Sequence, residues 1–214
     1  VYGGTFNLLK ETLPRYGITT SFVDVADFDE IEALQHKNQW DELTEMLVDA
    51  GTRLKKAGAD FLAICTNTMH KVADEVAEKT GLKVLHIADV TAEAIIQKNK
   101  NIVGLLGTDF TMSEDFYKKR LNDKYNIEVM IPEKMERERV HRVIYDELCC
   151  GIVKSQSKAE FITIINNLKD KGAEGVILGC TEIPMLIEQK DLDIRVFDSM
   201  KLHADAIVKE MLNG

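Results

Sequence analysis

The sequence has few cysteines, few prolines and a single tryptophan, and its acidic residues outnumber its basic ones. Four cysteines in 214 residues do not form a disulfide framework, and no pair has the Cys-x-x-Cys spacing of a zinc site. With 27 lysines and arginines against 36 aspartates and glutamates, the formal net charge is −9. Because polyanions are usually bound by basic patches, this balance argues against nucleic acid and anionic membranes as partners. It leaves open a small anionic substrate, which responds to the local charge of a cleft.

Long apolar runs are also missing. No run approaches the ~20 residues needed to span a bilayer, and no signal peptide is recognisable. The composition, 45% hydrophobic and 29% charged, is that of a globular protein long enough to bury a sizeable core. We therefore expect a protein of the reducing cytoplasm.

Short β-rich runs alternate along the chain with longer amphipathic stretches. Segments such as 40–56 and 159–171 carry apolar residues at helical spacing. Gly58, Gly81 and Gly172 stand where helices should end before the next strand. The alternation predicts an α/β fold with parallel sheets covered by helices. The expected strands are residues 22–25, 61–64, 83–87, 102–106, 128–131, 176–178 and 195–197.

An internal repeat divides the chain. Residues 58–66 (Gly-Ala-Asp, an apolar run, then Cys-Thr) resemble residues 172–181, and residues 91–95 resemble residues 203–207. The repeat predicts two pseudo-symmetric lobes, each a short parallel sheet flanked by helices, with an active-site cleft between them. We place the first lobe at residues 1–98 and the second at 99–198, and expect the C-terminal helix, 199–214, to pack on the first. Each lobe then has one Cys-Thr pair at the carboxyl end of a strand, where open parallel sheets bind ligands.

The first lobe lacks a counterpart to one strand of the second. The strand at 102–106 leads to Gly107-Thr108, whereas only Val1-Tyr2 precede the corresponding glycines Gly3 and Gly4. A central strand is hard to omit, because its neighbours would lose hydrogen-bond partners. Either further residues precede Val1 or another element fills the gap.

The two Cys-Thr segments are the candidate chemical groups. Cys65-Thr66-Asn67-Thr68 and Cys180-Thr181-Glu182 each precede an expected helix start, where free N–H groups lower a thiol pKa and bind a carboxylate. A single free cysteine is more often a small buried apolar residue. Two cysteines at equivalent positions of the repeat favour a function over a structural role. They suit the inversion of a Cα–H centre, which needs a base on one face and an acid on the other. Hydrogen bonds and desolvation would stabilise the carbanion-like transition state.

These motifs resemble those of the aspartate/glutamate racemase superfamily, aspartate-racemase branch. The resemblance spans about residues 27–214 and is carried by residues 27–32, 65–70, 107–112, 140–145, 172–184 and 197–198. It implies a two-lobe fold, cofactor-independent two-base racemisation of aspartate or glutamate, and a homodimer. By position, Cys65 and Cys180 are the acid/base pair, and neither a metal nor a cofactor is implied. The substrate-binding residues implied are Thr66, Asn67, Thr68, Thr181, Glu182, Thr111 and Lys154, with Glu182 also placed to tune the second thiol.

The first 24 residues depart from this pattern. Racemases of this kind open with a strand and a Gly-Gly-Met-type loop, whereas residues 1–24 resemble the Tyr-Gly-Gly-Thr segment of PLP-dependent Cys/Met-metabolism enzymes of the cystathionine γ-lyase type. In that family the tyrosine stacks on the cofactor, but the segments holding the Schiff-base lysine have no counterpart here. The interpretation is a chimera, with a short PLP-enzyme fragment grafted onto a racemase body.

Three alternatives stay open. A related cysteine enzyme such as a maleate isomerase or a decarboxylase is one, although the segment Gly179 to Pro184 argues for a racemase. An engineered chimeric scaffold without enzymatic activity is the second, and it would need only a packed core. PLP binding through Tyr2 is the third, and a visible absorption spectrum would exclude it.

Overall fold

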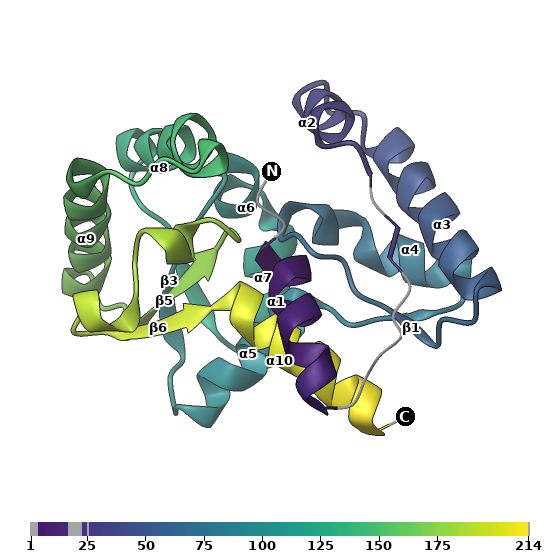
Figure 1. Cartoon of the computed structure of the whole chain (residues 1–214). Helices are drawn as coiled ribbons and strands as arrows, with labels where there is room; N and C mark the ends of the chain where they lie inside the picture. The colour runs from purple at the N-terminus through teal and green to yellow at the C-terminus, as the bar shows by residue number, and fades with distance from the viewer. Residues whose placement is uncertain (1–3, 17–22, 25, 214) are drawn as a thin grey trace.

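The computed structural model describes residues 4–16, 23–24 and 26–213 and has two parallel β-sheets flanked by helices (Figure 1). One sheet has two strands, β1 (Phe61–Leu62) and β2 (Lys83–Val84). The other has four strands in the order β4-β3-β5-β6. This confirms the predicted α/β fold with parallel sheets. In the described ranges no helix is long and apolar enough to cross a membrane.

The four-stranded sheet holds the main hydrophobic core. Its two central strands are apolar because helices cover them, as parallel sheets require, and β5 is buried along its whole length. The largest enclosed side chains include Tyr117, Phe161 and Leu105. Its elements are β3 (Ile102–Gly107), β4 (Glu128–Met130), β5 (Gly175–Gly179), β6 (Arg195–Asp198), α6 (Asp109–Ser113), α7 (Asp115–Tyr125), α8 (Lys134–Asp146) and α9 (Ser155–Asp170).

The two-stranded sheet has a smaller core of its own, built around Leu43, Leu62 and Met69. Its flanking helices are α2 (Phe28–His36), α3 (Trp40–Lys56) and α4 (Ala73–Thr80), whereas α5 (Ile87–Gln97) packs into the core of the four-stranded sheet. Short 3-10 helices cover Leu13–Tyr16, Thr68–Val72, Leu148–Cys150, Ile183–Met185 and Gln189–Asp191.

Two terminal helices complete the structure. Helix α10 (Ser199–Asn213) packs along α5, and α1 (Gly4–Thr12) packs against α10 (Figure 1). The buried face of α10 carries His203, Ala204, Ile207 and Val208. Helix α10 also touches β5 and β6, and its His203 Nε2 lies 2.8 Å from the carbonyl oxygen of Leu85, which follows β2, so this helix contacts both sheet regions.

The expected elements are largely present, with different ends. The strands expected at 61–64 and 83–87 stop at residues 62 and 84, because β1 and β2 pair with each other only over these residues. The expected helix at 40–56 is found with those bounds, and the one at 159–171 begins earlier, at Ser155. Of the strand expected at 22–25, residues 22 and 25 lie outside the described residues, and Val23 and Asp24 are not in a strand. Tyr2 and Gly3 also lie outside them.

The internal repeat is visible in the backbone. Gly58 and Gly172 have φ angles of +102° and +113°, a left-handed conformation that glycine adopts without a steric penalty. Each leads into a strand that pairs in parallel with the next, β1 with β2 and β5 with β6. The two repeats differ at the opposite edges of β1 and β5. Strand β5 also pairs with β3, whereas among the described residues β1 has no second strand partner.

Candidate active site

Both candidate cysteines follow the carboxyl end of a parallel strand. Cys65 comes three residues after β1 and is exposed, while Cys180 directly follows β5 and is buried. A 3-10 helix, Ile183–Met185, begins three residues after Cys180, and Pro184 lies in its first turn, where a missing N–H has no cost. Corresponding positions in the repeat therefore hold the two thiols, one accessible to solvent and one enclosed.

A hydrogen-bonded chain joins the two cysteine segments. Asn67 Nδ2 lies 3.2 Å from Ser199 Oγ, and Ser199 Oγ donates to the carbonyl oxygen of Leu178 at 2.7 Å. Asn67 and Ser199 are both buried. The chain therefore connects the loop after β1 with the strand that leads to Cys180.

Three threonine hydroxyls connect the first cysteine loop with the segment that follows β3. Thr68 Oγ1 lies 3.3 Å from Thr108 Oγ1 and 3.4 Å from Thr111 Oγ1, and the last two are 3.1 Å apart. All three residues are buried, and the Thr108 hydroxyl also caps α6 by accepting from the backbone N–H of Thr111. The structure thus brings together Thr68 and Thr111, which lie far apart in the sequence.

A carboxylate stands beside the second thiol. Cys180 Sγ donates to Glu182 Oε2 at 3.0 Å, and Thr181 Oγ1 donates to the same oxygen at 2.6 Å. Glu182 is buried, and these two hydrogen bonds hold its carboxylate in place. The Glu182 carboxylate is therefore hydrogen-bonded to both the Thr181 hydroxyl and the Cys180 thiol.

The thiols are harder to ionise than the sequence suggested. Burial raises the pKa of the Cys65 thiol to about 11, because its sulfur lies among protein atoms although the residue has solvent-accessible surface. Burial and the charge of Glu182 raise the pKa of Cys180 well above its usual range. The expectation that the helix starts lower these pKa values is wrong. Desolvation of the thiolate is the larger effect at both sulfurs, and at Cys180 it outweighs the backbone hydrogen bond of Glu182, which lowers the pKa.

Three buried histidines lie behind the first cysteine loop. His70 Nδ1 donates to the carbonyl oxygen of Thr66 at 2.7 Å, and its Nε2 accepts from the backbone N–H of Ile87 at 3.1 Å. The His70 ring lies 4.6 Å from that of His86 and 5.6 Å from that of His203. Burial lowers the pKa of His86 and of His203 to about 4, and that of His70 well below its usual value. At neutral pH the cluster is uncharged.

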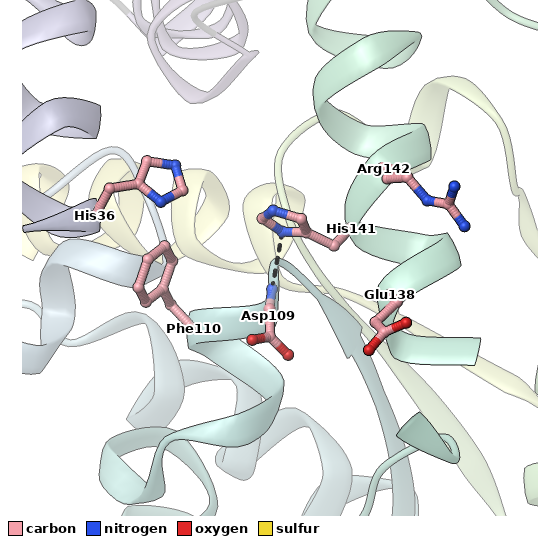
Figure 2. Close-up of a pocket in the computed structure, with 6 residues that line it drawn as sticks. All are labelled: His36, Asp109, Phe110, Glu138, His141 and Arg142. Atoms are coloured by element: carbon pink, nitrogen blue, oxygen red, sulfur yellow. Dashed lines mark hydrogen bonds between the residues drawn. The ribbon is translucent and has the colours of Figure 1, made fainter. Parts of the chain in front are cut away.

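An open pocket of about 370 Å³ lies between α2, α6 and α8 (Figure 2). In it His141 Nδ1 accepts from the backbone N–H of Asp109 at 3.2 Å. The His141 ring stacks 4.7 Å from Tyr145, one turn further along α8. Burial raises the pKa of Tyr145, and the nearby Glu32 and Cys180 add to this effect. The pocket thus adjoins the Cys180 region through α8, although the cysteines do not line it. Its lining residues are His36, Asp109, Phe110, Glu138, His141 and Arg142.

Lys154 has its contacts elsewhere. Its Nζ lies 3.4 Å from Glu147 Oε1, and its side chain is more than half exposed. Among the described contacts, no hydrogen bond joins Lys154 to either cysteine segment. Sequence reasoning also missed Ser199 and Thr108, because a serine after a strand and a threonine before a helix are common capping residues.

The protein is thus an α/β protein in which each of two parallel sheets has a cysteine after the carboxyl end of a strand. The chain belongs to the Asp/Glu/Hydantoin racemase family, whose model matches residues 4–207.

Known proteins of this kind resemble the whole chain. The crystal structure of a candidate Asp/Glu racemase from Yersinia pestis is 40% identical, covers 97% of this chain and 92% of its own, and has a TM-score of 0.89. The structure of an aspartate racemase homologue from Pyrococcus horikoshii OT3 is 33% identical, covers 100% of this chain and 92% of its own, and has a TM-score of 0.83. The broad specificity amino-acid racemase RacX from Bacillus subtilis (strain 168) is 25% identical over 80% of this chain and 74% of its own length.

Proposed function

We propose that the protein is a cofactor-independent amino-acid racemase in which Cys65 and Cys180 exchange a proton with opposite faces of the substrate Cα. Aspartate is the leading substrate and glutamate the second. The observation that carries the proposal is the hydrogen-bonded chain through Ser199 that joins the first cysteine loop to the strand leading to Cys180. The threonine hydroxyls join the same loop to the segment after β3. Membership in the family favours this function over an inactive scaffold.

The proposed proton transfers begin with one thiolate. Because Glu182 accepts the hydrogen bond of Cys180, its carboxylate can take the thiol proton and leave a Cys180 thiolate when substrate has displaced water. The thiolate removes the Cα proton from one face, and the thiol of Cys65 delivers its proton to the other face. The product leaves with Cys180 protonated and Cys65 as thiolate, which is the starting state for the opposite enantiomer.

The remaining proposed roles concern the α-amino-acid head. Asn67, Thr66, Thr68 and Thr181 supply polar groups to its ammonium and carboxylate, and these contacts also stabilise the carbanion-like transition state. Thr111 supports Thr68 through their hydroxyl contact. Lys154 is proposed as a contact of the substrate side chain, and it must leave Glu147 to make that contact.

The test is proton NMR in D2O with L- and D-aspartate and L- and D-glutamate. Loss of the α-proton signal with the wild-type protein, abolished in both Cys65→Ser and Cys180→Ser, is the expected result. The exposed Cys150 supplies the matched control, because Cys150→Ser should retain wild-type exchange. Absence of exchange from a folded, monodisperse wild-type protein would contradict the proposal, and formation of the opposite enantiomer by either active-site variant would contradict the two-base mechanism.

We further propose that residues 1–98 and 99–198 form the two lobes, that the protein acts as a homodimer, and that it resides in the cytoplasm. The four free cysteines suit a reducing compartment, and sedimentation at several concentrations tests the dimer. Digestion at the 98–99 connection followed by a folding assay of each piece tests the lobes.

The origin of residues 1–24 is a separate proposal. Their resemblance to a PLP-enzyme segment and the single strand partner of β1 support a grafted fragment. If so, replacing residues 1–24 with the corresponding segment of the Yersinia pestis relative should raise both thermal stability and exchange rate. Equal or lower values in the replaced protein would argue for a native segment.

A further inference from the structure

We infer that Ser199 is a positioning residue that fixes the side-chain amide of Asn67 so that Asn67 Oδ1 receives the α-ammonium group of the substrate. The inference rests on the proposed function and names how the same site holds the amino group. It follows from the hydrogen-bonding capacity of three groups: the carbonyl of Leu178, the hydroxyl of Ser199 and the amide of Asn67.

The direction of each hydrogen bond is determined. The Leu178 carbonyl has no hydrogen to give, so the single hydroxyl hydrogen of Ser199 must point to it across the 2.7 Å contact. Ser199 Oγ can then only accept from Asn67, and the amide nitrogen, which carries two hydrogens, must face it at 3.2 Å. An amide turned the other way would set two acceptors against each other.

This orientation leaves Asn67 Oδ1 on the other side of the amide. The oxygen is buried and has no hydrogen-bond partner among the described residues, in a side chain that is only 3% exposed. A buried acceptor without a donor is unfavourable, so the site is suited to a ligand that brings N–H groups. Cys65, two residues earlier, is exposed, so solvent and ligands reach this loop.

The position of Ser199 also relates the two thiols. Asn67 lies two residues after Cys65, and Leu178 lies two residues before Cys180, so the Ser199 hydroxyl spans the two segments at equal distances along the chain. Ser199 is completely buried at the start of α10. One hydroxyl therefore sets both the orientation of the ammonium acceptor and its place relative to the thiols.

The test compares ligands with and without an ammonium group by calorimetry. L-Aspartate and succinate, and L-glutamate and glutarate, are titrated into wild type, Ser199→Ala, Ser199→Thr and Asn67→Ala. We expect Ser199→Ala to weaken binding of the amino acids about tenfold and to leave the diacids unchanged, because Asn67 Oδ1 is then no longer held toward the charged ammonium group. Ser199→Thr keeps the hydroxyl and should restore much of the affinity.

A double variant decides the route of the effect. If Ser199 acts through Asn67, then Ser199→Ala combined with Asn67→Ala binds amino acids no more weakly than Asn67→Ala alone. Equal weakening of amino acids and diacids, or additive losses in the double variant, would overturn the inference, as would a wild-type protein that binds neither amino acid. If the diacids bind too weakly to measure, the comparison of the double variant with Asn67→Ala decides whether the inference holds. Selective ammonium binding without α-proton exchange would keep the inference and overturn the proposed reaction.

Discussion

At the scale of single residues, Glu182 determines the properties of the second thiol. Its carboxylate accepts from both Cys180 and Thr181, and its negative charge adds to burial in raising the pKa of Cys180. The same group therefore opposes thiolate formation in the empty site and can receive the proton when the thiol ionises. Neither effect is available from an uncharged side chain.

We predict that Glu182→Gln slows α-proton exchange about 100-fold, because the amide can accept the thiol hydrogen bond but cannot take the proton. Without the negative charge, the pKa of Cys180 should fall, so alkylation by iodoacetamide should begin at lower pH. Alkylation of Cys180 is measured in a variant in which Cys65, Cys149 and Cys150 are replaced by serine. Unchanged exchange in Glu182→Gln would remove Glu182 from the mechanism, and an unchanged alkylation profile would contradict the electrostatic coupling.

The buried histidines predict a pH dependence of stability. Their pKa values are lowered in the folded protein, to about 4 for His86 and His203, so the unfolded chain binds more protons than the folded one between about pH 6.5 and pH 4. The free energy of unfolding should therefore fall as the pH falls through this window, by up to about 1.4 kcal/mol per pH unit for each histidine.

Urea unfolding at pH 7, 6 and 5 measures this slope. His203→Gln can still donate to the Leu85 carbonyl that His203 Nε2 contacts but cannot be protonated, so its slope should be smaller than that of wild type. The exposed His36 is the control, and His36→Gln should leave the slope unchanged. Equal slopes for all three proteins would show that the buried histidines do not control acid sensitivity.

At the scale of elements, the close approach of β3 and β5 at their carboxyl ends builds the site. A Cβ placed on Gly107 would lie 2.9 Å from the carbonyl oxygen of Gly179 and 3.1 Å from Thr111 Cβ. The two strands pair at this point, with Gly107 opposite Gly179. Glycine is therefore required for the threonine hydroxyls and the Cys180 segment to lie at their observed separation.

We predict that Gly107→Ala costs about 1–3 kcal/mol of stability and slows exchange about 100-fold, because a displacement of ~1 Å suffices for such a loss. Gly104→Ala, in the same strand, is the matched control. Its added Cβ would meet the end of the flexible Leu168 side chain at 2.9 Å, so we expect a comparable loss of stability with most exchange retained. Thermal unfolding and D2O exchange of both variants check the comparison.

The periodicity of the sequence predicted most elements because apolar residues repeat in it at helix or strand spacing. The helix at Trp40–Lys56 was predicted with its observed bounds. The strands β1 and β2 were predicted too long, since apolar residues continue past Leu62 and Val84 into turns that support the site. Strand length depends on which partner lies alongside, and β1 has fewer partners than its counterpart β5.

At the scale of the whole molecule, the repeat in the sequence predicted that Cys65 and Cys180 follow the carboxyl ends of strands, and they follow β1 and β5. The network around them could not be predicted in the same way. Ser199 lies 132 positions after Asn67, and only the packing of α10 on α5 brings it to the first cysteine loop. Burial, which raises the thiol pKa values, also depends on contacts between distant segments.

Arg120 is the clearest connection between elements that flank the two sheets. Lying on α7, it makes a bidentate contact with Asp89 on α5 at 2.6 and 2.8 Å and contacts Asp74 on α4 at 2.9 and 3.0 Å. The Arg120 side chain is only 12% exposed, whereas Asp74, its partner beside the smaller sheet, is exposed. Lysine cannot reproduce the two-pronged geometry of the guanidinium group.

We predict that Arg120→Ala uncouples the two sheets and costs about 1–3 kcal/mol. The single tryptophan, Trp40 on α3, reports on the smaller sheet and on its contact with Phe110 of α6, whereas far-ultraviolet ellipticity reports on the whole chain. In wild type both signals should change at the same urea concentration, and in Arg120→Ala the fluorescence should change first. Lys83→Ala, which breaks the exposed contact with Glu210, should leave the two transitions together. If both signals shift equally in Arg120→Ala, the residue stabilises the molecule as a whole and the two sheets are held together by other contacts, such as that of His203 on α10 with the Leu85 carbonyl after β2.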